Sequence, residues 1–161
     1  MGVGKTTLGI SLAKALSMGF FDIDSQIEYS EKKSIAEIFT LHGEAYFRSL
    51  EASMCKKIST ITDCVVSTGG GIVLDPQNHH ILQKYCTILH LTATHETILQ
   101  RLENDKSRPL IVDAKKARIA ELMAQRASLY SQIADFEIAT DNLSVQELVD
   151  ICTPYILTCK S

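Results

Sequence analysis

The sequence predicts an α/β fold in which helices flank a mainly parallel β-sheet. Helical and strand-like stretches alternate along the 161 residues, as they do in chains built from repeated β-α-β units. At the N-terminus a glycine-lysine loop runs directly into an amphipathic stretch, as in a loop that binds phosphate at a helix start. The chain length and a hydrophobic content of 45% indicate a single domain covering residues 1–161.

The expected elements follow from periodicity, capping signals and runs of β-branched residues. In order along the first half, they are a helix over 5–16, a short strand over 20–23, a helix opened by the capping box Ser34 to Glu37, a helix over 44–61 and a strand over 64–67. In order along the second half, they are a helix capped by Asp75 and begun by Pro76, a strand over 87–91, a helix over 96–102, a loop over 104–113, a helix over 115–130, a strand over 136–139 and a helix over 144–157.

Composition excludes several classes of function. The net charge of −3 provides no basic field for nucleic acid, and no run of 18 apolar residues is present to span a membrane. The cysteines form no CxxC pair and fit no zinc spacing, so we expect reduced thiols and a cytoplasmic protein. These are Cys55, Cys64, Cys86, Cys152 and Cys159. We therefore expect no nucleic-acid partner and no membrane association.

The strongest motif is the phosphate loop formed by Gly2, Val3, Gly4, Lys5, Thr6 and Thr7. Gly4, Lys5 and Thr6 match the end of the GxxxxGK[ST] motif, in which backbone N–H groups curl around phosphate oxygens. Lys5 would contact the β- and γ-phosphates, and the Thr6 hydroxyl would bind Mg²⁺. ATP and Mg²⁺ are therefore the expected cofactors.

The same motif is incomplete at its beginning. Its first glycine would fall two residues before Met1, and a strand normally precedes such a loop. We expect that the chain is shortened at its N-terminus and that the first, usually central, strand is missing. A stable fold would then need some other cover for that position in the sheet.

Two acids end the strand over 20–23, where open α/β sheets bind ligands. Asp22 could hold Mg²⁺ directly or through water, and Asp24 could orient or deprotonate an acceptor hydroxyl. The alternative for Asp24 is a helix cap.

Further candidates for acceptor binding are glycines and arginines. Gly69, Gly70 and Gly71 follow a buried strand and would permit a close approach of backbone to ligand, or a tight turn. Arg48 lies three residues from Glu51, so the two can pair on one helix face. Arg108 lies in the predicted loop, suited to closing over phosphates. Arg101 and Arg126 complete the set, and each arginine could instead be a solvated surface charge.

Seven segments appear in the order typical of shikimate kinases, a family of small P-loop kinases. They are GVGKTT, FFDID, SIAEIF, GEAYFRSLE, STGGG, SRPL and QRASLY, and the resemblance as a whole runs from Gly2 to about Leu157. This resemblance implies a three-layer fold with a five-stranded parallel sheet, substrate-binding helices over about 31–61, and a lid over about 104–115. It implies ATP-dependent phosphorylation of the 3-hydroxyl of shikimate, in aromatic amino-acid and chorismate biosynthesis, by a cytoplasmic enzyme that we expect to be a monomer.

The resemblance also implies roles for individual residues. Lys5, Asp24 and Arg108 would be catalytic, Thr6 and Asp22 would serve the metal, and Arg101 would stack on adenine, with Arg108 near the transferred phosphate. The shikimate pocket would be formed by Asp24, Phe39, Phe47, Arg48, Gly69, Gly70, Gly71 and Arg126, in which Arg48 and Arg126 bind the carboxylate.

Two other functions remain open on the sequence. A gluconate or nucleotide kinase would share the phosphate loop but would not readily explain GEAYFRSLE together with STGGG. A non-catalytic binding module is suggested by the incomplete loop, yet it would not need Lys5, Thr6, Asp22 and Asp24 together.

Overall fold

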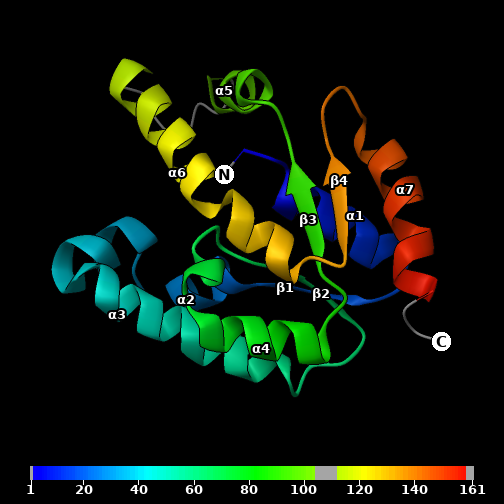
Figure 1. Cartoon of the computed structure of the whole chain (residues 1–161). Coiled ribbons are helices and arrows are strands. Elements are labelled where there is room, and N and C mark those ends of the chain that lie inside the picture. The colour runs from blue at the N-terminus through cyan, green and yellow to red at the C-terminus, as the bar shows by residue number, and fades with distance from the viewer. Residues whose placement is uncertain (1, 104–111, 159–161) are drawn as a thin grey trace.

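A computed structural model of the chain describes residues 2–103 and 112–158, and it leaves the side chains of residues 102, 103 and 112–119 undescribed. Its helices and strands alternate as the sequence predicts (Figure 1). They are α1 (Lys5–Ala15), β1 (Gly19–Asp22), α2 (Ile23–Glu31), α3 (Ile35–Ile58), β2 (Cys64–Ser67), α4 (Pro76–Tyr85), β3 (Leu89–Thr92), α5 (His95–Glu103), α6 (Val112–Ile133), β4 (Phe136–Ala139) and α7 (Val145–Thr158), with a 3-10 turn, η1, at Ile72–Leu74.

The strands form two parallel pairs. β1 pairs with β2, with Gly19 opposite Cys64, and β3 pairs with β4, with Leu89 opposite Phe136. The predicted α/β class with parallel strands is confirmed. Among the described residues the two pairs are separate two-stranded sheets, not one continuous sheet.

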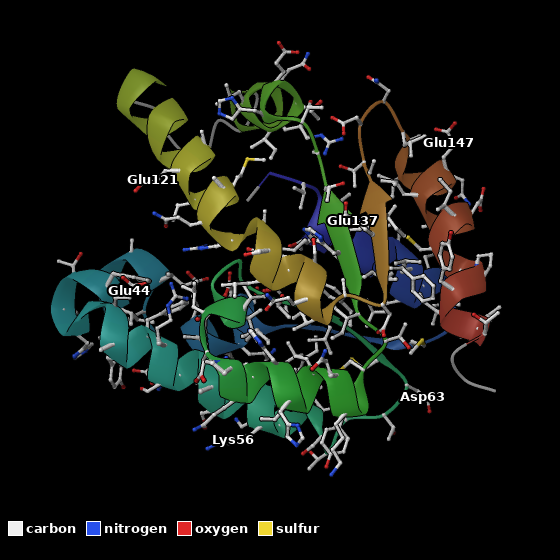
Figure 2. All side chains as sticks on the ribbon, in the orientation of Figure 1. Glu44, Lys56, Asp63, Glu121, Glu137 and Glu147 are labelled. Atoms are coloured by element: carbon white, nitrogen blue, oxygen red, sulfur yellow. The ribbon has the colours of Figure 1, made fainter. Side chains whose placement is uncertain are left out.

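Caps begin three of the helices where the sequence places them. Ser34 and Glu37 form the capping box of α3, and Ser144 and Glu147 form hydrogen bonds of the same kind at the start of α7, where Figure 2 labels Glu147. These hydrogen bonds from serine lower the pKa of both glutamates. Asp75 accepts a hydrogen bond from the Gln77 backbone before α4. Local sequence therefore fixes these helix starts.

Some predicted boundaries are wrong. Ile23 begins α2 rather than ending a strand, because Asp22 caps that helix by accepting from the Ser25 backbone N–H. The helices expected around residues 35 and 44 form one element, α3, kinked at Gly43, whose φ of 79° glycine adopts readily. Val112 and Asp113, placed in the loop by the sequence, belong to α6. Of the predicted lid over about 104–115, residues 104–111 lie outside the described residues.

The core consists of two apolar clusters on opposite sides of the strands. The first cluster joins α2, α3, α4 and the end of α6, and Val66 of β2 packs against it. The second joins α1, α7 and β4, and Val65 of β2 packs against that one. Since neighbouring residues on a strand point to opposite faces, β2 contributes to both layers. The three-layer arrangement predicted from the sequence follows.

No helix among the described residues is long and apolar enough to cross a membrane. The four cysteines in the described part of the chain are free thiols, as expected.

Candidate active site

The site lies at the carboxyl ends of β1 and β2, where the phosphate loop meets the glycine run. A cavity of about 1710 Å³ opens here, and its lining includes the predicted residues Gly2, Val3, Gly4, Lys5, Thr6, Thr7, Asp22, Asp24, Gly69, Gly70, Arg101 and Arg126. The fold therefore brings together residues that are far apart in the sequence. This is the edge at which open α/β sheets bind ligands.

Glycine and a helix start shape the phosphate loop. Gly4 occupies the N-cap position of α1 with a φ of 90°, a left-handed conformation that glycine adopts without strain. No side chain caps α1, so the first backbone N–H groups of the helix remain available for an anion. Burial lowers the pKa of Lys5, and the nearby carboxylates of Asp24 and Asp22 oppose that shift. A cation, free N–H groups and two acids thus meet at one place.

Thr6 and Asp22 are in contact. The Thr6 hydroxyl donates a hydrogen bond to Asp22 Oδ2 at 3.3 Å, while Asp22 Oδ1 caps α2 at 3.0 Å from the Ser25 backbone nitrogen. A hydroxyl beside a carboxylate is a suitable pair for Mg²⁺, whose remaining ligands are usually phosphate oxygens and water. No group of three His, Cys, Asp or Glu residues able to hold a metal occurs in the described ranges.

Asp24 and Glu51 converge above Gly69. A Cβ atom added to Gly69 would lie 2.6 Å from Asp24 Oδ1 and 2.9 Å from Glu51 Oε1, so only glycine leaves both oxygens in place. Each of these oxygens is buried without a hydrogen-bond partner in the described structure. Burial raises the pKa of both carboxyl groups; Asp22 adds to the shift of Asp24, while Arg48 opposes that of Glu51. Two buried acceptors facing one point suit a ligand that supplies hydrogen-bond donors.

A network of acids fixes Arg48. Its Nη1 donates to Glu51 Oε2, and its Nη2 and Nε donate to Glu44 Oε1 at 2.9 and 3.2 Å. Figure 2 labels Glu44 on α3, one turn before Arg48. A Cβ atom at Gly71 would lie 1.9 Å from Arg48 Nη1. The third glycine of the run therefore allows the guanidinium group to sit against the backbone.

Arg126 and Tyr130, both on α6, contact the backbone of the glycine run. Arg126 Nη1 donates to the Gly70 carbonyl oxygen at 3.0 Å, and the Tyr130 hydroxyl donates to the same atom at 2.5 Å. These two bonds hold α6 against the loop that follows β2. Arg126 therefore reaches the site, one glycine away from Arg48.

Of the other predicted residues, Arg101 lines the same cavity, and Phe47 lies beside Arg48, whose Cζ atom is 5.3 Å from the centroid of the Phe47 ring. Arg101 binds Thr140 at the end of β4, through Nη1 to the hydroxyl at 2.9 Å and Nη2 to the carbonyl at 2.7 Å. Phe39 and Phe47 pack against each other, with ring centroids 4.8 Å apart, in the first apolar cluster. Arg108 lies outside the described residues.

Sequence reasoning missed two of the residues that shape the site. Glu51 was expected to pair with Arg48, and it does, but its near-complete burial and its position beside Asp24 depend on how α3 packs. Tyr130 lies within the QRASLY segment, but nothing in that segment indicated a bond to Gly70. The alternative of a helix cap, considered for Asp24, applies to Asp22.

A glycine loop at a helix start, with a lysine and a Thr–Asp pair beside it, defines the class of P-loop phosphotransferases. The shikimate kinase family model matches residues 1–156. A shikimate kinase from Geobacter metallireducens is 41% identical over 97% of this chain and 87% of its own length, and one from Caldicellulosiruptor saccharolyticus is 43% identical over 89% and 84%. The chain is therefore an enzyme of the shikimate kinase family, and the resemblance drawn from its motifs is confirmed.

Comparison with solved structures also supports membership of this family. A shikimate kinase from Acinetobacter baumannii in complex with shikimate superposes with a TM-score of 0.90 at 32% identity, covering 99% of this chain and 90% of that one. A gluconokinase from Sinorhizobium meliloti reaches a TM-score of 0.56 at 12% identity, covering 93% and 83%. The second likeness shows a common fold alone.

Proposed function

We propose that this chain transfers the γ-phosphoryl group of ATP to the 3-hydroxyl of shikimate, giving shikimate 3-phosphate in aromatic amino-acid and chorismate biosynthesis. The observation that carries this proposal is that the phosphate loop, Asp24, Arg126 and the first two glycines of the glycine run line one cavity, while Arg48 packs against the third glycine. Membership of the family supports it.

The phosphate loop would bind the nucleotide. Its backbone N–H groups and the start of α1 hold phosphate oxygens, and Lys5 neutralises the charge that develops on the transferred group. Thr6 and Asp22 would hold Mg²⁺, which when bound neutralises the β- and γ-phosphate oxygens. Arg101, at the end of α5, would contact adenine, and Arg108 would approach the phosphates from the lid.

Asp24 would position the acceptor hydroxyl and receive its proton. Its Oδ1 atom is buried and free to accept a hydrogen bond, and Asp24 lies close enough to Lys5 for their charges to interact. Burial raises the pKa of Asp24, which brings it closer to that of a useful proton acceptor near neutral pH. Orienting the acceptor hydroxyl toward the γ-phosphate is the main contribution that a protein makes on the acceptor side of phosphoryl transfer.

The carboxylate of the substrate would be held by Arg48 and Arg126. Guanidinium groups bind carboxylates through two parallel hydrogen bonds, and these two arginines reach the glycine run from α3 and α6 respectively. Gly69, Gly70 and Gly71 would present backbone to the ring, and Phe39 and Phe47 would support the apolar wall. Shikimate, a small carboxylate with vicinal hydroxyls, matches this set of groups.

A coupled assay that offers ATP with shikimate, gluconate or nucleoside monophosphates tests the proposal. We expect turnover of shikimate and none, or far less, of the other acceptors. Turnover of gluconate in preference to shikimate would favour the enzymatic alternative. Saturable binding of shikimate without turnover would favour a binding module. We further propose that the enzyme acts as a cytoplasmic monomer without nucleic-acid or membrane partners, which sedimentation of the purified protein would test for oligomeric state.

A further inference from the structure

The carbonyl oxygen of Gly70, the middle glycine of the run, accepts hydrogen bonds from two side chains of α6. The carbonyl groups on either side of it accept instead from backbone N–H groups within the same loop. The donors to Gly70 are Arg126 Nη1 and the Tyr130 hydroxyl. A carbonyl oxygen has two lone pairs, so these two donors satisfy it. Because glycine has more backbone freedom than any other residue, the conformation of the run depends on this contact with α6.

The two donors differ in what else they can bind. Arg126 gives Gly70 one of the five N–H donors of its guanidinium group, at 3.0 Å, and its remaining donors could bind an acceptor carboxylate. Tyr130 has a single hydroxyl, which lies 2.5 Å from the same oxygen. Burial raises the pKa of Tyr130, although Arg126 opposes the shift, so the hydroxyl keeps its proton and remains a donor at neutral pH. Tyr130 can therefore hold Gly70 while Arg126 also binds a ligand.

The ring of Tyr130 is itself held from β3 and β4. It stacks on the His90 ring of β3, with centroids 4.9 Å apart and an angle of 26° between the planes, and it packs against the first apolar cluster. His90 lies opposite Glu137 of β4, with Nδ1 3.0 Å from Oε2 (Figure 2 labels Glu137). The Ser131 hydroxyl, next to Tyr130 on α6, donates to the same Oε2 atom at 3.4 Å. The β3–β4 pair thus fixes the ring whose hydroxyl holds the glycine run.

We propose that Tyr130 is a positioning residue of the acceptor site and that His90 acts through it. The Tyr130 hydroxyl holds the Gly70 carbonyl, which keeps the glycine run in place when Arg126 turns its other donors to a carboxylate. His90 keeps the Tyr130 ring in the orientation that this hydrogen bond needs. Neither side chain has to touch the acceptor. The inference rests on the proposed function for the identity of the acceptor, but not for the hold of Tyr130 on the glycine run.

The first experiment is Tyr130→Phe, which removes the hydroxyl and keeps the ring that stacks on His90. We expect KM for shikimate to rise roughly three- to tenfold, the effect of one neutral hydrogen bond. Both kcat and KM for ATP should change less than about twofold, whereas a general loss of folded enzyme would lower kcat instead. The matched control is Tyr155→Phe on α7, whose ring also pairs with a neighbour, Phe136, at 4.3 Å between centroids. The control should leave all three constants unchanged.

The second experiment tests whether His90 acts through Tyr130. His90→Ala removes the stacked ring, so we expect KM for shikimate to rise about two- to fivefold. His90→Phe restores a flat ring and should return KM close to the parent value. In a double variant with Tyr130→Phe, His90→Ala should add nothing further, because the hydroxyl through which it acts is already absent. Additive effects, or a His90→Phe variant as impaired as His90→Ala, would overturn the role of His90.

Amide hydrogen exchange without nucleotide or acceptor measures the hold on the glycine run directly. We expect faster exchange over residues 69–74 in Tyr130→Phe, and parent-like exchange in Tyr155→Phe. Equal exchange in the parent and Tyr130→Phe would overturn the inference, whatever the acceptor is. If the parent turns over shikimate and Tyr130→Phe leaves its KM unaltered, the positioning role alone fails. If the parent does not turn over shikimate but Tyr130→Phe still speeds exchange, the hold of Tyr130 is supported and the proposed function alone fails.

Discussion

The nucleotide half and the acceptor half of the site are built in different ways. In the acceptor half, the groups are already hydrogen-bonded to one another. Arg48 donates to Glu44 and Glu51, and the Gly70 carbonyl oxygen accepts hydrogen bonds from Arg126 and Tyr130 of α6. In the nucleotide half, the helix start has no side-chain cap, and one 3.3 Å hydrogen bond links Thr6 to Asp22. The acceptor half is thus organised before substrate arrives, whereas the nucleotide half keeps its donors free for phosphates. Substitutions in the nucleotide half should therefore change kcat or the dependence on Mg²⁺, whereas substitutions in the acceptor half should change KM for shikimate.

The largest expected effect is at Lys5. In Lys5→Met the side chain keeps its length but loses its charge, so the developing negative charge on the phosphates is no longer neutralised. We expect kcat to fall by about 10²–10³-fold, measured in the coupled assay at saturating shikimate. Because burial already disfavours the charged form of Lys5, the fold should tolerate the change. An unaltered kcat would mean that the backbone N–H groups of the phosphate loop stabilise the developing charge without Lys5.

Asp24 lies between the two halves and should affect the chemical step alone. Asp24→Asn keeps the shape of the side chain but cannot take a proton, so we expect kcat to fall roughly 10²-fold. Nucleotide affinity, measured by calorimetry, should be unchanged. An unchanged kcat would reduce Asp24 to a structural residue.

The pH dependence of stability provides a control for the same variant. The pKa of Asp24 is raised by burial, so the folded state holds its proton more tightly than the unfolded state. Stability from this group is therefore present below its unfolded pKa near 3.8 and is lost as pH rises through the folded value. We expect Asp24→Asn to unfold at the same or a higher temperature than the parent at neutral pH, with the difference narrowing in acid. A less stable variant at neutral pH would contradict the raised pKa.

Much of this arrangement could be predicted from the sequence, for identifiable reasons. Capping boxes and the phosphate loop are local patterns, so the starts of α3 and α7 and the position of Lys5 were predicted correctly. Two features could not be predicted, because they depend on contacts between segments that are distant in the sequence. The burial of Glu51 beside Asp24 requires α3 to pack against the glycine run, and the continuity of α3 through Gly43 depends on tertiary support for a kink. The roles assigned to the individual site residues, from Lys5 and Asp24 to Arg101 and Arg126, remain predictions.

Neighbouring glycines offer a matched pair of tests in the acceptor half. A Cβ atom at Gly71 would lie 1.9 Å from Arg48 Nη1, the end of a flexible side chain that can move aside. A Cβ atom at Gly70 would lie 3.2 Å from the Tyr130 hydroxyl and 3.5 Å from Arg126 Nη1, which needs only a small shift. Gly71→Ala should therefore displace Arg48 and raise KM for shikimate roughly 10- to 100-fold, about 1.5–3 kcal/mol, and Gly70→Ala much less. KM for ATP should stay constant in both. Equal effects of the two alanines would show that Arg48 does not bind the carboxylate from its place beside Gly71.

The smallest expected effect separates two roles of Asp22. This residue caps α2 through one oxygen and contacts Thr6 through the other. Asparagine caps a helix about as well as aspartate, so Asp22→Asn should leave the unfolding temperature unchanged and raise the Mg²⁺ concentration for half-maximal activity roughly tenfold. Asp22→Ala should show the same change in Mg²⁺ dependence and lose a further ~1 kcal/mol of stability with the cap. If Asp22→Asn kept the parent's Mg²⁺ dependence, Asp22 would be a cap alone. The nucleotide half would then hold its metal through Thr6 and the phosphates, which would make it still more dependent on its ligand than the acceptor half.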